Sequence, residues 1–423
     1  MPLFHSKRFL PLFLTQFLGA FNDNLLKNAL VMLVTYHVAV QTGSNAQILV
    51  TLAAGLFILP FFLFSATAGQ LADKYDRAKL TRIIKIAEIA IMAIAIAGFA
   101  IQNVALLLFA LFCMGVHSTF FGPIKYVLLP QHLHDDELLQ GNAYIEAGTF
   151  LAILLGTILG GVLILQTGGV YYVSFALLAL AITGYCISRY IPEAPAPEPT
   201  LIINRNIWQE TLHIIGFSKT DKKVFLCILG ISWFWLVGAT FLSQFAPYVK
   251  NVIYADASVV TLLLTVFSIG IGIGSVLCNK LLHGVIKSTY VPLAAICMTI
   301  FGIDLYFASN AIALSYRTEL MTLWEFIGSF SGLRILIDLF FIAVSGGVYI
   351  VPLYAIMQQK SEAIHRARII AANNVMNALF MVAATLLTLA MLSLSFTIPQ
   401  VFLTVALLNG LVAIYAAIKL EKL

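Results

Sequence analysis

Long apolar stretches, separated by short polar segments, run along the whole chain. The hydrocarbon core of a membrane is about 30 Å thick, and an α-helix crosses it with about 20 apolar residues. Twelve stretches reach that length, and they begin near Phe9, Ala46, Thr81, Val104, Leu139, Val170, Lys223, Ser258, Thr289, Ile335, Arg368 and Thr397. The pattern therefore predicts an all-α integral membrane protein with twelve transmembrane helices.

The most polar stretch lies in the middle of the chain and divides the apolar stretches into six and six. It opens with prolines from Pro192 to Pro199, which favour a stiff extended segment. Apolar residues then recur at helical spacing from Ile207 to Phe217, which is typical of an amphipathic surface helix. We therefore predict a bundle at 1–191, a cytoplasmic linker with an amphipathic helix at 192–222, and a second bundle at 223–423.

The two predicted bundles share a weak internal similarity. Gly122-Pro123 in the fourth stretch corresponds to Gly346-Gly347 with Pro352 in the tenth, and an Asn-bearing helix start follows each of them. Such parallel repeats are typical of transporters, which place the substrate site between the repeats near the middle of the membrane. The sequence thus predicts two six-helix repeats.

Composition supports a lipid environment for most of the chain. Of the 423 residues, 61% are hydrophobic and 10% are charged, whereas soluble domains are about 25% charged. This excludes a soluble enzyme, a disordered chain and a secreted disulfide scaffold. The five cysteines lie in apolar runs, where they are expected to act as small buried hydrophobic residues.

The positive charges predict an orientation. Most of the 24 Lys and Arg residues fall in segments on the same side as the N-terminus, whereas Lys250, Arg317 and Arg334 fall on the other side. Because positive loops stay in the cytoplasm, both termini are expected to be cytoplasmic. The net charge of +5 therefore reflects topology. A nucleic-acid partner is not expected, because it would require a basic face on a soluble domain.

The loop between the second and third stretches carries a specific motif. It reads Gly69-Gln-Leu-Ala-Asp73-Lys74-Tyr-Asp76-Arg77-Ala-Lys79 and resembles the signature loop of the major facilitator superfamily. That resemblance implies the major facilitator fold and transport by alternating access. Gly69 would allow two helices to approach closely, and Asp73 would meet a helix N-terminus or a basic partner in one access state. Lys74 and Arg77 also follow the positive-inside rule, and Asp76 stands where the pattern usually has glycine.

Several polar residues fall inside the predicted spans of the first bundle. An ionisable residue at mid-membrane costs roughly 2.5–3.5 kcal/mol on insertion scales, so it is retained where it faces protein or water. The set comprises Asp23, Asn24, Lys27, Lys125, Asn142 and Glu146. One interpretation is a neutral structural network in which Asp23 pairs with Lys27 or Lys125. The other is a binding site for a zwitterionic phosphate–amine headgroup, because lysines suit phosphate and carboxylates suit ammonium.

Other polar positions have more than one interpretation. Asp23 or Glu146 could carry a coupling H⁺ or help to hold Na⁺, and Glu88 is expected to pair with Lys85 one turn away. Arg334 and Asp338 form either a gate at the exterior end of the tenth stretch or a plain helix salt bridge. The run from His132 to Glu137 could suggest a metal site, but a solvated loop is favoured and no metal or other cofactor is expected.

The glycines Gly156, Gly160 and Gly161 resemble an antiporter motif in which Thr157 replaces the usual proline. Small residues at this spacing mostly allow tight helix packing, which is the preferred interpretation. If the antiporter interpretation held, the chain would be a cation-coupled exporter of a small amphipathic molecule such as a drug or siderophore. This export function is the alternative to the one that the next resemblance implies.

Three stretches resemble the bacterial lysophospholipid transporter family (LplT-type), and resemble still more the transporter half of fusions with a 2-acylglycerophosphoethanolamine acyltransferase. The stretches run from Thr15 to Asn24, from Gly122 to Tyr126, and from Gly141 to Ala147, and the resemblance extends over residues 334–358. It implies a flippase that moves lysophosphatidylethanolamine-like lipids across the bacterial inner membrane to the cytoplasmic leaflet, for phospholipid remodelling. It also implies that Asp23, Asn24, Lys125, Asn142 and Glu146, with Lys27 from the fusion-type pattern, bind the headgroup or a coupling ion.

The enzymatic half of such fusions is not expected here. Acyltransferases of that type use a His-x4-Asp motif, whereas His132 is followed five residues later by Glu137. We therefore predict a transport module without enzymatic activity, either naturally separate or cut from a longer fusion. A lysophospholipid substrate, membrane lipids and a cytoplasmic-side acyltransferase are the expected partners, and a monomer is the expected state.

Overall fold

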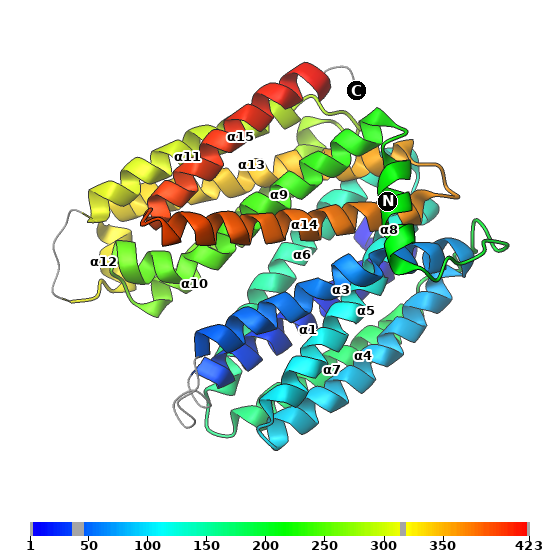
Figure 1. Cartoon of the computed structure of the whole chain (residues 1–423), viewed down its shortest axis with the longest axis horizontal. Helices are drawn as coiled ribbons and strands as arrows, with labels where there is room; N and C mark the ends of the chain where they lie inside the picture. Colours follow the sequence, from blue (N-terminus) through cyan, green and yellow to red (C-terminus); the bar gives the residue numbers. More distant parts are fainter. Residues whose placement is uncertain (1–2, 36–45, 314–318, 421–423) are drawn as a thin grey trace. The chain divides into compact units, whose positions relative to one another are not determined.

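The computed structural model describes residues 3–35, 46–313 and 319–420 and is built from helices (Figure 1). Arg317, one of the predicted exterior cations, lies outside the described residues. In chain order the elements are η1 (Leu3–His5), α1 (Leu10–Leu33), α3 (Ala46–Lys74), α4 (Arg77–Ala100), α5 (Val104–His132), α6 (Asp135–Ile164), α7 (Gly169–Ser188), α8 (Ile207–Ser218), α9 (Lys222–Tyr248), η3 (Val249–Ile253), α10 (Ala257–Leu281), α11 (Val291–Ala313), α12 (Leu323–Gly328), α13 (Phe330–Lys360), α14 (Arg366–Ser393) and α15 (Ile398–Leu420).

The helices confirm the predicted fold class. Within the described part of the chain, 11 helices are long and apolar enough to cross a membrane. The 24-residue α1, whose middle carries Asn22, Asp23, Asn24 and Lys27, is the twelfth long helix. Most predicted starts agree closely with the observed ones. The widest disagreement is at α13, which begins at Phe330 rather than Ile335.

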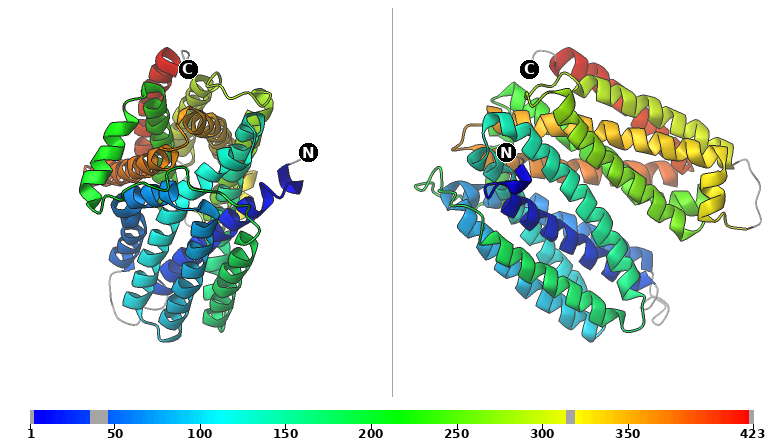
Figure 2. Two further views of the ribbon diagram at one scale, coloured as in Figure 1. Left: turned by 90° about the vertical axis from the view of Figure 1, so that its right-hand side faces the viewer. Right: turned by 180° about the vertical axis from the view of Figure 1, so that it is seen from behind.

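Close packing groups the chain into two compact units. Unit 1 comprises Met1–Gly141, Leu151–Lys222 and Gln358–Ala378, and unit 2 comprises Asn142–Phe150, Lys223–Met357 and Leu379–Leu423. In unit 1, α5 packs along α3 and α4, and α7 packs along α1 and α4 (Figure 2). In unit 2, α11 and α15 lie side by side (Figure 1). The sequence-based division at 192 and 222 stays a prediction.

Two glycines of α6 allow a very close approach to α1 within unit 1. A Cβ at Gly160 would lie 2.5 Å from the backbone oxygen of Leu25, and one at Gly156 would overlap the backbone oxygen of Phe21. Real Cβ atoms do not come so close to a carbonyl, so these positions exclude every larger residue at this spacing. The structure thus gives the Gly156–Gly161 run a packing role.

Gly160→Ala is expected to destabilise the protein by about 1–3 kcal/mol, because the added methyl forces α6 away from α1. Gly216 of α8 is a matched control, since a Cβ there meets nothing within 4 Å. Gly216→Ala should leave stability unchanged or raise it slightly. Thermal unfolding of both purified variants in detergent measures the difference. Equal melting temperatures would contradict the packing role.

Residues 192–199, here named the linker strap, form neither helix nor strand and belong to unit 1. Four hydrogen bonds fix them: Arg77 N donates to Ala194 O at 2.9 Å, Ala194 N to Asp76 Oδ2 at 3.3 Å, Gln131 Nε2 to Pro195 O at 3.1 Å, and Glu198 N to Asp73 O at 3.1 Å. The strap therefore joins the ends of α3, α4 and α5 near the motif loop.

The expected helix of the linker is α8, which packs on α3. The side chain of Asn206 caps its first turn by accepting a hydrogen bond from Gln209 N at 3.1 Å. Trp208 and Leu212 are 59% and 72% exposed. Exposed apolar side chains on a helix of this kind are typical of a helix lying at a membrane surface.

Candidate functional site

The motif loop centres on Asp73, whose side chain is completely buried in unit 1. Its two carboxylate oxygens each accept a hydrogen bond from the first turn of α14, from Ala367 N and Arg368 N, both at 3.3 Å. They also accept hydrogen bonds from Arg77 Nη2 at 3.2 Å and Arg368 Nε at 3.1 Å. Four donors at a helix N-terminus thus hold this buried carboxylate in place.

Two other motif residues, Gly69 and Arg77, support the contact between Asp73 and α14. Gly69 faces α14 so closely that a Cβ would lie 2.8 Å from Ala371 Cβ. Arg77 also donates from Nε to Ala72 O at 2.9 Å, which fixes its guanidinium beside Asp73. Lys74 is partly exposed and its ammonium lies 5.9 Å from the centre of the Tyr75 ring. Gly69, Asp73 and Arg77 are thus brought together, whereas Lys74 points away from them.

Asp76, the departure from the usual glycine, has a local role. It caps α4 by accepting a hydrogen bond from Lys79 N at 2.7 Å, and its second oxygen binds the linker strap. Asp is among the best N-cap residues.

Arg368 links the motif loop to the linker strap. Besides Asp73, its guanidinium binds Glu198 at 2.5 Å and donates to Nδ1 of His365 at 2.8 Å. Burial, and then the positive charge of Arg368, lower the pKa of His365. The neutral ring is the form that can accept this hydrogen bond.

A second polar cluster is buried in the helix core of unit 1. Glu88 of α4 accepts hydrogen bonds from Lys85 Nζ at 2.7 Å and from Asn22 Nδ2 of α1 at 2.8 Å. All three residues are at most 1% exposed. The expected pairing of Glu88 with Lys85 is therefore confirmed. The hydrogen bond from Asn22 to Glu88 was not predicted, because the two residues lie far apart along the chain.

His117 of α5 also belongs to this cluster and was missed by the sequence analysis. Its Nε2 lies 3.3 Å from Glu88 Oε2, and the residue is 5% exposed. The available signal was a single histidine within an apolar run, which is a weak indication of function.

The candidate headgroup residues of unit 1 lie on α1 and α5. Ser118 donates to Asp23 Oδ2 at 2.7 Å, and Asn24 donates to Ala20 O at 2.8 Å. The ammonium of Lys27 lies 5.7 Å from the centre of the Phe57 ring, and that of Lys125 lies 4.7 Å from the Tyr126 ring. Asp23, Lys27 and Lys125 are partly exposed, so both charge signs are available on these two helices.

Asn142 and Glu146 are fully buried on α6, in the segment that belongs to unit 2. Neither residue is without a partner. Nearby in unit 2, Phe150 stacks on Trp235 with ring centroids 6.1 Å apart. The role of Asn142 and Glu146 in headgroup binding stays a prediction.

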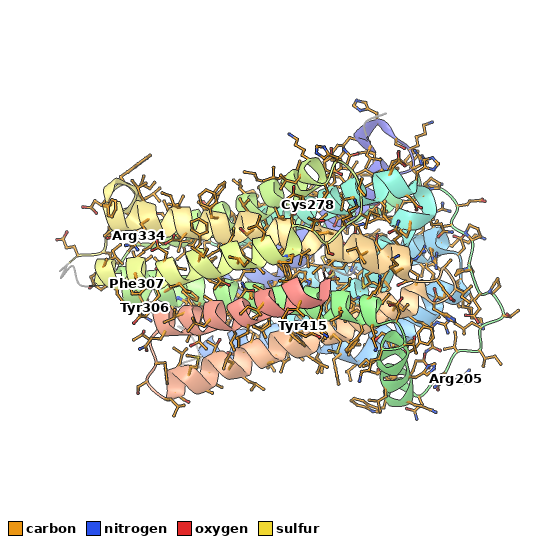
Figure 3. All side chains as sticks on the ribbon, turned by 90° about the horizontal axis from the view of Figure 1, so that it is seen from above. Arg205, Cys278, Tyr306, Phe307, Arg334 and Tyr415 are labelled. Carbon is orange, nitrogen blue, oxygen red and sulfur yellow. The ribbon has the colours of Figure 1, made fainter. Side chains whose placement is uncertain are left out.

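In unit 2, the carboxylate partner of Arg334 differs from the one that the sequence predicted. Its Nε donates to Asp304 Oδ2 of α11 at 2.8 Å and its Nη2 to the other oxygen, so the guanidinium binds both oxygens. Figure 3 labels Arg334 at its place on α13. Asp338 is only 2% exposed. The predicted Arg334–Asp338 ion pair is thus corrected, because bidentate geometry favours Asp304. A gate role for either residue stays a prediction.

The acidic run after α5 is used as a helix cap. Glu137 accepts a hydrogen bond from His134 N at 3.0 Å and binds Arg8 through two hydrogen bonds of 3.1 Å. His132 ends α5, and the acidic residues 135–137 form the first turn of α6. Most of the run is at least partly exposed, as expected, but it is divided between two helix ends rather than forming a loop.

Known proteins resemble this chain in sequence. Residues 12–385 match the family described as the Major Facilitator Superfamily. The lysophospholipid transporter LplT of Serratia proteamaculans is 24% identical over 375 residues, which cover 84% of this chain and 81% of the relative. LplT of Escherichia coli K12 is 26% identical over 365 residues with the same coverage.

Solved structures share the fold at low sequence identity. The human organic anion transporter MFSD10 has a TM-score of 0.74 at 14% identity, covering 96% of this chain and 98% of that one. The proton:xylose symporter XylE has a TM-score of 0.72 at 13% identity, covering 98% and 95%. The twelve long helices of the described residues, the Asp73 motif loop and the family match over residues 12–385 all indicate the same superfamily. The chain therefore belongs to the Major Facilitator Superfamily.

Proposed function

We propose that this protein is a lysophospholipid transporter that moves lysophosphatidylethanolamine-like lipids across the bacterial inner membrane to the cytoplasmic leaflet. The observation that carries the proposal is the similarity to LplT proteins over 84% of the chain. The polar residues of α1 and α5 support it, since they offer both charge signs on partly exposed side chains. A zwitterionic headgroup requires that combination.

In this proposal the headgroup binds to the polar residues and the acyl chain stays in apolar surroundings. Lys125 and Lys27 would hold the phosphate, and Asp23 would hold the ammonium. Asn24, Asn142 and Glu146 would complete the site or carry a coupling H⁺ or Na⁺. Alternating access would depend on the motif loop, with Arg334 and Asp338 acting at the exterior end.

The remaining expectations follow from the same proposal. Both termini would be cytoplasmic, the protein would act as a monomeric flippase without enzymatic activity, and an acyltransferase on the cytoplasmic side would re-acylate the delivered lipid during phospholipid remodelling. That acyltransferase would be a separate or fused partner.

Uptake of labelled lysophosphatidylethanolamine into proteoliposomes tests the proposal. Asp23→Asn and Lys125→Ala should each reduce uptake about tenfold, because a charge-assisted hydrogen bond contributes about 1.5–3 kcal/mol. Lys280→Ala is the matched control, since Lys280 is exposed in the last turn of α10 and lies outside the proposed site and the motif loop. Unchanged uptake by both site variants would refute the site. Export of a drug without lipid movement would favour a cation-coupled exporter instead.

A further inference from the structure

The buried cluster of Asn22, Lys85, Glu88 and His117 is a second polar site in unit 1, and the proposed headgroup site does not use it. It contains two opposite charges and a titratable ring in the core of a helix bundle. Each buried ionisable residue is costly in a membrane protein and is retained mainly for structure or function. Lys85 and Glu88 neutralise one another, but His117 is not needed for that balance.

The cluster is connected to Asp23 at two points. Asn22 and Asp23 are adjacent on α1, and His117 and Ser118 are adjacent on α5. Asp23 binds Ser118 directly at 2.7 Å. Asn22 binds Oε1 of Glu88 at 2.8 Å, and His117 Nε2 lies 3.3 Å from Oε2 of the same carboxylate. A change of charge at His117 therefore acts on Asp23 over a short, mostly buried path.

Hydrogen bonding around His117 is incomplete. Within the described residues, neither ring nitrogen has a partner with hydrogen-bond geometry, although Nε2 is at ion-pair distance from Glu88. Oδ1 of Asp23 and Oδ1 of Asn22 are also buried without a hydrogen-bond partner in the described part of the chain. Buried polar atoms are normally satisfied, and exceptions require an explanation. One added proton would give the ring two N–H donors, one of them beside the Glu88 carboxylate.

We propose that His117 is a proton-binding site, and that its proton and the ammonium of a bound headgroup compete for the negative charge of Asp23. The first half stands on the geometry of unit 1, and the second half rests on the proposed function. The proton is taken up on a ring nitrogen and released again, with no bond to carbon made or broken.

The charged groups around His117 determine the net charge of the cluster. Lys85 and Glu88 come from α4 and Asp23 from α1, with Lys27 one turn beyond Asp23. The packed helix α3 carries acidic or basic residues only in its last turn, at Asp73 and Lys74. With the ring neutral, the two acids and two lysines cancel. With the ring protonated, the cluster has one excess positive charge, which disfavours an approaching ammonium.

Binding and protonation are therefore linked in both directions. A headgroup whose ammonium binds Asp23 should release the proton from His117, and acidification should weaken binding of the headgroup by the same factor. Histidine is suited to this role because its charge changes near neutral pH.

Nitrogen-15 NMR of histidine-labelled protein in lipid nanodiscs tests the proton site without any substrate. The sequence has 8 histidines, and the signal missing from His117→Gln or His117→Asn identifies the ring. Acidification should convert this signal from the neutral to the protonated pattern. In Asp23→Asn, which removes a nearby negative charge, the protonated-to-neutral ratio at a given pH should fall about tenfold. A signal that does not titrate, or that ignores Asp23→Asn, would overturn the proton site.

Proton release on addition of lysophosphatidylethanolamine tests the link to the headgroup. At about pH 6, wild type should release up to one proton per bound lipid, and His117→Gln should release none. His213→Gln is the control, since that ring is 63% exposed on α8, and it should behave as wild type. Lipid that binds without proton release would overturn the competition. A ring that titrates in a protein that binds no lysolipid would leave the proton site standing and refute the proposed function.

Discussion

Asp73→Asn should lower transport at least tenfold and destabilise the protein by about 3 kcal/mol. The reason is that removal of one partner from a buried ion pair leaves the other charge uncompensated. Here two guanidiniums, those of Arg77 and Arg368, would lose the carboxylate they share. The first turn of α14 would also lose its charged cap. Lysolipid uptake and thermal unfolding of the same purified protein provide the two measurements.

Asp76→Asn is the matched control for that prediction. It makes the same chemical change three residues away, but Asn keeps the helix cap and loses only the 3.3 Å hydrogen bond from Ala194 N. Its stability should therefore stay within about 1 kcal/mol of wild type. Similar losses in the two variants would mean that Asp73 has no special role at the start of α14.

Glu88→Gln should be the most destabilising single substitution in the core of unit 1. It leaves the completely buried ammonium of Lys85 without its carboxylate, and such a change typically costs about 3–5 kcal/mol. His117 and Asn22 would lose the same partner. Thermal unfolding in detergent measures the loss, and Glu362→Gln on the surface should have almost no effect.

The double variant Lys85→Met with Glu88→Gln distinguishes a loss of stability caused by an unpaired charge from one caused by altered packing. Because it removes both charges, it should recover most of the stability lost in Glu88→Gln. If the double variant were as unstable as the single one, packing rather than an unpaired charge would explain the loss.

The membrane helices could be predicted from the sequence because their signal is local. Apolar length depends on neighbouring residues, so starts such as Val104 were predicted correctly. The start of α13 was less accurate, because the helix continues beyond the apolar run through Ser331 and Gly332.

The partners of the polar residues depend on contacts between distant segments. Arg334 was expected to pair with Asp338 on its own helix, whereas its partner Asp304 lies on another helix 30 residues away. The motif indicated that Asp73 would meet a helix N-terminus, but not that α14 would supply it. His117 was missed for the same reason, since its neighbours Glu88 and Asp23 come from two other helices. Residue types can be read from the sequence, whereas these pairings depend on how the helices pack.

The linker strap changes where the chain can be divided into modules. A cut before Pro192 would follow the sequence repeats, but it would remove the partners that Asp76, Arg77 and Gln131 find in residues 194 and 195. It would also separate Glu198 N from Asp73 O, to which it donates at 3.1 Å. A cut between Ser218 and Lys222 would keep the strap and α8 with the helices that they contact. For split-protein complementation or fusion of a reporter, the natural junction of this transporter therefore lies after α8.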